Sequence, residues 1–165
     1  MPSFAIKHAS VDDIPDIIKI QEKTWETTYK DILSKEQIDY MFEKIYSPDS
    51  LNHQMLNEKH RFLMLENNGN SEGFASVSKE SPETFKLHKI YVLPSLQGSG
   101  AGKYMLNEIE NYIRSEGGSK LILNVNRFNK ARSFYERMGF YVTEEKDIPF
   151  GPYWMNDYIL EKDLS

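Results

Sequence analysis

Apolar residues recur at helical spacing in the first third of the chain. A short alternating segment from Phe4 to His8 predicts a strand, and Ser10 then offers a capping-box start for a first helix. Ser34 offers a similar start for a second helix, and a shorter helix is expected over Leu51 to Asn57. The apolar positions are Ile14, Ile17, Ile18 and Trp25 in the first helix, and Ile38, Met41, Phe42 and Ile45 in the second.

The middle of the chain changes to strand-like patterning. Three strands are predicted over Arg61 to Glu66, Gly73 to Lys79 and Phe85 to Leu93. The polar turn Asn67-Asn68-Gly69-Asn70 joins the first two, and Pro94 ends the third. This order predicts an antiparallel meander.

The last third alternates between helices and strands. An amphipathic helix is predicted from Lys103 to Glu116, with Gly117-Gly118 after it. The apolar strand Leu121 to Val125 then fits the second strand of a parallel β-α-β unit. A short helix capped by Asn129 and ended by Gly139 follows, with closing strands at Tyr141 to Thr143 and Trp154 to Leu160. The elements together predict an α+β fold with a sheet of about seven strands, in a single domain over residues 1–165.

Composition and charge narrow the possible chemistry. The 165 residues include no Cys, so a thiol nucleophile and a disulfide are excluded, and the four His show no paired metal-ligand spacing. No metal site is expected. A net charge of −5 disfavours nonspecific nucleic acid binding and is compatible with a small cationic substrate. With no apolar run of about 20 residues and no signal-peptide pattern, we expect a cytoplasmic protein without a membrane role.

Three glycines in five residues stand between the third strand and the following helix. They occur in Gly98-Ser99-Gly100-Ala101-Gly102. Free amide groups and the dipole at a helix start favour an anion, and glycine lets the backbone approach a phosphate closely. The segment from Gln97 to Lys103 is therefore predicted to hold the diphosphate of a nucleotide-type cofactor.

Two common phosphate loops do not fit this segment. The Walker A pattern needs Gly at position 97 and Ser or Thr after Lys103, where the chain has Gln97 and Tyr104. The dinucleotide pattern G-x-G-x-x-G needs a third glycine where the chain has Lys103 or Met105. The pattern that does fit is Gln-x-x-Gly-x-Gly, from Gln97 to Gly102.

This loop resembles the acetyl-CoA loop of the GNAT superfamily of N-acetyltransferases. Upstream, Ile90-Tyr91-Val92-Leu93-Pro94 is similar to the cofactor-pairing strand of that family. Downstream, the segment from Asn129 to Phe140 is similar to its Asn-x-x-Ala-x-x-Phe-Tyr-x-x-x-Gly-Phe segment. The resemblance implies a mixed, mostly antiparallel sheet with a central, splayed parallel pair, flanked by helices. It also implies an acetyl-CoA dependent N-acetyltransferase acting on a primary amine, and dimers are common among similar proteins.

The resemblance also implies the residues that bind the cofactor. The strand of Tyr91, Val92 and Leu93 would lie along pantetheine, with the Val92 amide facing the thioester carbonyl. The amides of Gly98, Ser99, Gly100, Ala101, Gly102 and Lys103 would hold the diphosphate. Lys103 would add positive charge, and Gln97 would brace the loop. Asn129 would contact the pantetheine arm, although it also reads as a helix cap, and both can hold.

Two residues are candidates for proton transfer. Tyr135 matches the family tyrosine that protonates the sulfur of coenzyme A, although it also fits a buried aromatic stripe on its helix. His88 stands on the strand where many relatives carry a carboxylate base. It is a candidate base or a structural residue, and Glu26 is an alternative base.

Fewer sequence features indicate the acceptor than the cofactor. Aromatic residues, among them Trp25, Tyr29 and Tyr153, either line an amine pocket through cation-π contact or belong to the core. The segments around Trp25 to Tyr29 and Tyr153 to Lys162 are similar to those of bacterial enzymes acting on polyamines or other small amines. Two alternatives remain open: a non-catalytic acyl-CoA binding or sensing module, and acetylation of a protein or peptide amine.

Overall fold

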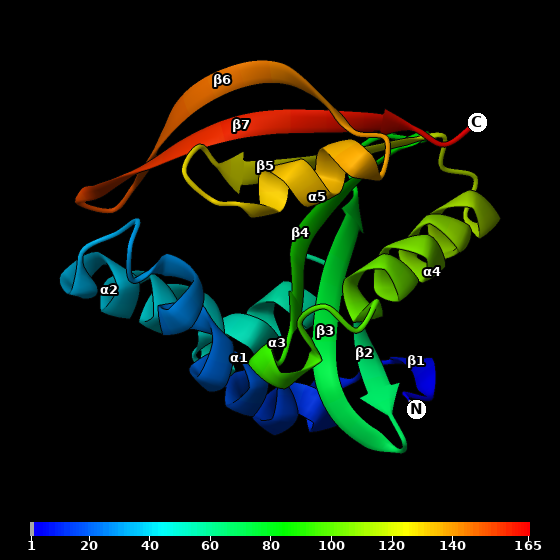
Figure 1. Ribbon diagram of the computed structural model, residues 1–165, viewed down its shortest axis with the longest axis horizontal. Coiled ribbons are helices and arrows are strands. Elements are labelled where there is room, and N and C mark those ends of the chain that lie inside the picture. Colours follow the sequence, from blue (N-terminus) through cyan, green and yellow to red (C-terminus); the bar gives the residue numbers. More distant parts are fainter. Residues whose placement is uncertain (1) are drawn as a thin grey trace.

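Seven strands pair into one mixed sheet in the computed structural model, which describes residues 2–165 (Figure 1). The strands are β1 (Phe4–His8), β2 (Arg61–Asn67), β3 (Asn70–Lys79), β4 (Thr84–Val92), β5 (Lys120–Asn126), β6 (Tyr141–Phe150) and β7 (Tyr153–Asp163). The helices are α1 (Ile14–Tyr29), α2 (Lys35–Tyr46), α3 (Pro48–Leu56), α4 (Ala101–Ser115) and α5 (Ala131–Arg137), with short 3-10 turns at Val11–Asp13 and Pro94–Leu96.

The strands lie in the order β1-β2-β3-β4-β5-β7-β6, and β4 and β5 form the one parallel pair of the sheet described. Their pairing ends at Leu87 opposite Leu123, whereas β4 continues to Val92 and β5 to Asn126. The two strands therefore separate over the second half of their length. The predicted fold class, with its central splayed pair, is confirmed.

The helices cover both faces of this sheet. Apolar residues of α1, α2 and α3 form one core with β2 and β3, while α4 and α5 form a second core on the opposite face. In Figure 1, α1 and α2 lie to the left of β4 and α4 lies to its right. The inner side of α4, with Leu106, Ile109 and Ile113 fully buried, follows the predicted amphipathic pattern. Each such side chain stabilises the fold by about 1.5–3 kcal/mol.

Several local signals act as the sequence predicts. The Ser10 side chain accepts from the Asp12 amide, and the Ser34 side chain accepts from the Gln37 amide, so both serines cap helical segments. The β2–β3 turn places Asn68 at φ 53° and Gly69 at φ 86°. At the end of α4, the Gly118 amide donates to the Ile113 carbonyl.

Several predicted boundaries were wrong: α3 begins at Pro48 rather than Leu51, β3 at Asn70 rather than Gly73, and β7 ends at Asp163 rather than Leu160. The strand expected at Tyr141 to Thr143 continues to Phe150, because β6 lies at the edge of the sheet and its middle residues are exposed and charged. An edge strand of this kind lacks the apolar alternation from which strands are predicted. Helix α4 begins at Ala101, two residues earlier than expected, so the last residues of the glycine loop form its first turn.

Candidate active site

A cavity of about 990 Å³ lies where β4 and β5 separate. It reaches from the glycine loop, through the gap between the strands, to the ends of α1 and α2. Most of the residues singled out from the sequence line it: Trp25, Tyr29, His88, Tyr91, Val92, Gln97, Gly98, Gly100, Ala101, Gly102, Lys103, Asn129 and Tyr135. Leu93, Ser99 and Tyr153 do not line it.

The glycine loop points free backbone amides toward this cavity. Gly98 and Gly100 have φ of 78° and 88°, a region that side-chain-bearing residues rarely adopt. Among residues 2–165, no acceptor lies within hydrogen-bond distance of the amides of Gly98, Gly100, Gly102 or Lys103. Unpaired amides at the start of a 15-residue helix suit a phosphate oxygen, so the loop fits the diphosphate of acetyl-CoA.

Ser99 has a different part in the loop. Its hydroxyl donates to the Leu96 carbonyl at 2.6 Å and accepts from the Ala101 amide at 3.3 Å. Both contacts hold the loop shape from within. The Ser99 amide also donates to the Leu96 carbonyl, and the residue does not line the cavity. The structure therefore gives no support to the predicted contact between this amide and the cofactor.

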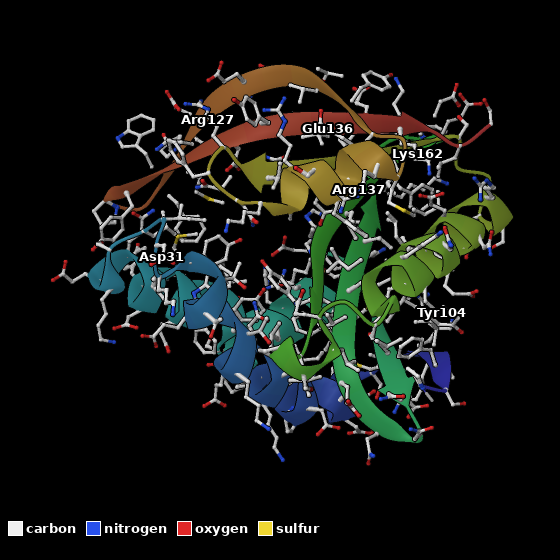
Figure 2. All side chains as sticks on the ribbon, in the orientation of Figure 1. Asp31, Tyr104, Arg127, Glu136, Arg137 and Lys162 are labelled. Carbon is white, nitrogen blue, oxygen red and sulfur yellow. The ribbon has the colours of Figure 1, made fainter. Side chains whose placement is uncertain are left out.

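Lys86 and Lys89 of β4 line the cavity, and three further cations that line it come from the glycine loop and the two ends of α5. They are Lys103, predicted from the sequence, and Lys130 and Arg137, which the sequence reading missed. None of the three pairs with an acidic group within the part of the chain that the structure describes. Arg137 lies at the end of α5, below the helix in Figure 2. Positive side chains around a phosphate-binding loop would attract a polyanionic cofactor.

The free edge of β4 offers further backbone groups. The Leu93 amide donates to the Glu72 carbonyl at 2.9 Å, on the side of β3. Because amides alternate in direction along a strand, the Val92 amide points the other way, into the gap. The gap thus has room for an extended chain to pair with β4. Leu93 itself faces β3, so its predicted contact with the cofactor has no support in this geometry.

Tyr135 lies on α5 where the helix faces the gap. Tyr135 is 9% exposed, and its ring packs edge-on against Phe134 and Phe140 at centroid distances of 5.4 and 5.7 Å. Burial, with a smaller effect of Tyr29, raises the pKa of the phenol well above its usual value. The phenol therefore keeps its proton at neutral pH, as a proton donor must before it acts.

Asn129 lies one residue before the cap position of α5, which Lys130 occupies. The Asn129 Oδ1 still accepts a hydrogen bond of 2.9 Å from the amide of Ala131, the first residue of α5. This bond satisfies a free amide at the helix start, as a capping side chain does. The side chain also lines the cavity, so the contact with pantetheine stays a prediction.

The three aromatic residues predicted for the acceptor pocket separate in the structure. Trp25 is 4% exposed and its indole donates to the Ile38 carbonyl at 3.0 Å, so it ties α1 to α2. Tyr29 reaches the cavity, where its hydroxyl lies 3.2 Å from that of Tyr91. Tyr153 lies outside the cavity and packs against Tyr40 at 5.4 Å, so it has no path to a substrate there.

His88 has the surroundings of a structural residue. Its ring stacks on His60 at 4.1 Å, and its Nε2 lies 2.7 Å from the Ser78 hydroxyl. Burial lowers the pKa of His88 to about 3, and the charges of His60, Lys89 and Lys86 add to this. A group with such a pKa scarcely takes up a proton at neutral pH. The geometry therefore argues against His88 as the base, and Glu26, the alternative, is exposed and outside the cavity.

The sequence reading missed a buried carboxylate at the acceptor side. Asp157, on β7, is 3% exposed and lines the cavity, and burial raises the pKa of its carboxyl. Asn124 of β5 donates to its Oδ2 at 3.4 Å. Only an alternation count along β7 could have placed Asp157 on the face of the sheet that α1 covers, because no motif marks it.

Within residues 2–165, no three His, Asp or Glu side chains come together in a way that could hold a metal ion. No helix there is long and apolar enough to cross a membrane.

Known proteins resemble this chain over most of its length. A family model described as an acetyltransferase (GNAT) domain matches residues 29–153. The chain is 27% identical to spermidine N(1)-acetyltransferase of Thermoplasma acidophilum, covering 97% of both proteins. It is 28% identical to the uncharacterised N-acetyltransferase YuaI of Bacillus subtilis, covering 79% of this chain and 76% of YuaI.

Solved structures agree with these relatives. The crystal structure of PaiA N-acetyltransferase from Thermoplasma acidophilum, in complex with coenzyme A, superposes with a TM-score of 0.84 at 26% identity, covering 98% of this chain and 99% of that one. The glycine loop, the open edge of β4 and the family match thus agree with one another. The chain belongs to the GNAT family, and it is an N-acetyltransferase that uses acetyl-CoA.

Proposed function

We propose that this protein transfers the acetyl group of acetyl-CoA to a primary amine of a small, polyamine-type acceptor, by direct attack in a ternary complex. One observation carries the proposal. The cavity passes through the sheet, so that free amides and cations line one end while tyrosine hydroxyls, a carboxylate and the side chains of Lys86 and Lys89 line the other. The relative that acts on spermidine supports the acceptor class.

The cofactor side would use backbone groups for most of its contacts. The amides of Gly98, Gly100, Gly102 and Lys103 would hold the diphosphate, with Lys103 adding charge. Gln97 would brace the loop from its exposed position, and pantetheine would lie along Tyr91 and Val92 in the gap. Asn129 would contact the same arm from the start of α5.

The chemistry needs three things from the chain. Acetyl-CoA supplies an activated acyl group, and the carbon-nitrogen bond forms as the carbon-sulfur bond breaks. The Val92 amide donates a hydrogen bond to the acyl oxygen as negative charge develops there. The Tyr135 phenol gives its proton to the departing sulfur and recovers one from solvent, while the attacking nitrogen, neutral before attack, loses a proton to solvent through the open cavity.

The acceptor would approach from the α1 side of the sheet. Tyr29 and Tyr91 present their hydroxyls there, while Trp25 supports Tyr29 from behind at a ring distance of 4.5 Å. Direct attack needs no acyl-enzyme, in agreement with the absence of cysteine from the sequence.

A thiol-release assay tests this function. Acetyl-CoA would be incubated with the protein and a panel of polyamines, monoamines, amino acids, aminoglycosides and lysine peptides. We expect coenzyme A release that depends on polyamines or other small amines, with the acetylated amine identified by mass. Tight acetyl-CoA binding without release from any amine would favour a sensing module, and release by peptides alone would favour a protein substrate.

A further inference from the structure

Asp157 is a buried carboxylate without a cationic partner. Along β7 it alternates with Tyr158, whose ring packs on the α4 and α5 side, so Asp157 faces α1 and α2. Its one side-chain hydrogen bond within residues 2–165 is the contact of 3.4 Å from Asn124. Because a buried carboxylate is costly unless it is paired, this position needs an explanation.

The two cations whose charges act on Asp157 form no ion pair with it. Arg127, labelled in Figure 2, bonds Asp147 at 2.7 Å and Glu145 at 3.1 Å, both on β6. Lys86 faces the same region from β4 but forms no ion pair with Asp157 at 4.0 Å or less. Asn124 donates a hydrogen bond to the carboxylate, and the charge of the carboxylate acts on Tyr29. The carboxylate thus has space for a cation that comes through the cavity.

We propose that Asp157 binds a second cationic nitrogen of the acceptor, one that is not acetylated. The acceptor class is then a diamine or polyamine, in which one amine reaches the acetyl group while another pairs with Asp157. This inference rests on the proposed acetyltransferase function and names the feature that its acceptor must carry.

The position of Asp157 relative to Tyr135 supports the distal nitrogen. Tyr135 packs in the core on the α4 and α5 side, whereas Asp157 is on the opposite face of the sheet. An amine paired with Asp157 would therefore lie across the sheet from the proposed proton donor.

The test compares two acceptors of equal chain length, butylamine and 1,4-diaminobutane. In the unchanged protein we expect kcat/KM to favour the diamine by at least tenfold. Asp157→Asn keeps the shape and removes the charge. It should raise KM for the diamine by roughly 30-fold or more, since the loss of one partner of a desolvated charge pair has effects of this size. For butylamine, kcat/KM should change less than about threefold.

Two further variants isolate the effect. Glu144→Gln removes a negative charge from the exposed part of β6 and should leave both acceptors unchanged. Lys86→Gln removes a cation that competes for Asp157, so KM for the diamine should stay the same or fall. If Lys86→Gln instead raises this KM as much as Asp157→Asn does, the carboxylate serves Lys86 and the proposal is wrong.

Two outcomes separate this inference from the function on which it rests. If no amine on the panel releases coenzyme A, the acetyltransferase proposal fails. If amines are acetylated but Asp157→Asn leaves the diamine preference intact, or slows both acceptors equally through kcat, Asp157 does not bind a distal cation. The KM for acetyl-CoA and the thermal unfolding of each variant show that cofactor binding and folding are intact.

Discussion

The two sides of the gap between β4 and β5 are built from different parts of the polypeptide. On the α4 side, the cavity is lined by residues of one loop between Gln97 and Lys103, all except Ser99, and most of their amides are free. On the α1 side, it is lined by side chains from separate elements, among them Tyr29, Tyr91 and Asp157. A backbone site requires glycines at fixed spacing, whereas a side-chain site needs only that a few residues meet after folding. The acetyl donor is thus marked by a motif, and the acceptor is not.

The largest effect on activity is expected from a substitution of Tyr135, which lies where the two sides of the gap meet. Tyr135→Phe removes the proposed proton donor while keeping the ring that packs on Phe134 and Phe140, so kcat should fall roughly 100-fold or more. The affinity for acetyl-CoA, measured by calorimetry, should change little. Tyr104→Phe on α4, a tyrosine outside the cavity, is the matched control and should leave kcat unchanged. Equal rates in both variants would remove Tyr135 from the mechanism.

The next largest effect is expected on acetyl-CoA affinity, from a substitution in the glycine loop. A β-branched residue at the positive φ of Gly100 costs about 1–3 kcal/mol of strain, and relief of that strain displaces the loop amides. Gly100→Val should therefore weaken acetyl-CoA binding by roughly tenfold or more. Gly117→Val carries similar strain, at φ 85°, at the far end of α4. Gly117→Val should lower stability while acetyl-CoA affinity stays the same. If Gly117→Val weakened acetyl-CoA binding as much as Gly100→Val does, displaced loop amides would not explain the loss of affinity.

A smaller effect, on stability rather than activity, is expected from Asp157 on the α1 side of the gap. Burial raises the pKa of Asp157, so the folded protein binds its proton at a pH where the unfolded chain has released it. The charged carboxylate thus destabilises the fold above this raised pKa, and the cost disappears below the ordinary value of 3.8. Asp157→Asn should raise stability by about 1 kcal/mol at pH 7, or roughly 2–4 °C in Tm. Near pH 4 or below, the two unfolding curves should approach each other; a constant difference would contradict an uncompensated charge.

The smallest effect is expected at His88. Its ring is buried in a stack with His60 and its pKa is about 3, so His88 takes up almost no proton near neutral pH. His88→Gln should change kcat by less than about threefold, and the pH dependence of kcat between pH 6 and 9 should keep its shape. A large loss with a shifted pH profile would restore His88 as the base.

The same contrast explains how much of the molecule could be predicted from its sequence. Periodic apolar positions predicted α1, α2 and α4, because each of these helices has one buried side. The charged middle of β6 could not be assigned, because an edge strand has no buried pattern. Gly98 and Gly100 were identified because their φ angles exclude most other residues. Asp157 and Arg137 were missed because a single charged residue carries no sign of where its side chain lies after folding.

Direct transfer across the gap makes a kinetic prediction that a single experiment can test. Initial rates would be measured with acetyl-CoA and 1,4-diaminobutane both varied. A cavity in which donor and acceptor meet predicts double-reciprocal lines that intersect, since both must be bound before the acetyl group moves. Parallel lines, together with an acetylated form of the protein detected by mass, would contradict direct transfer in a ternary complex.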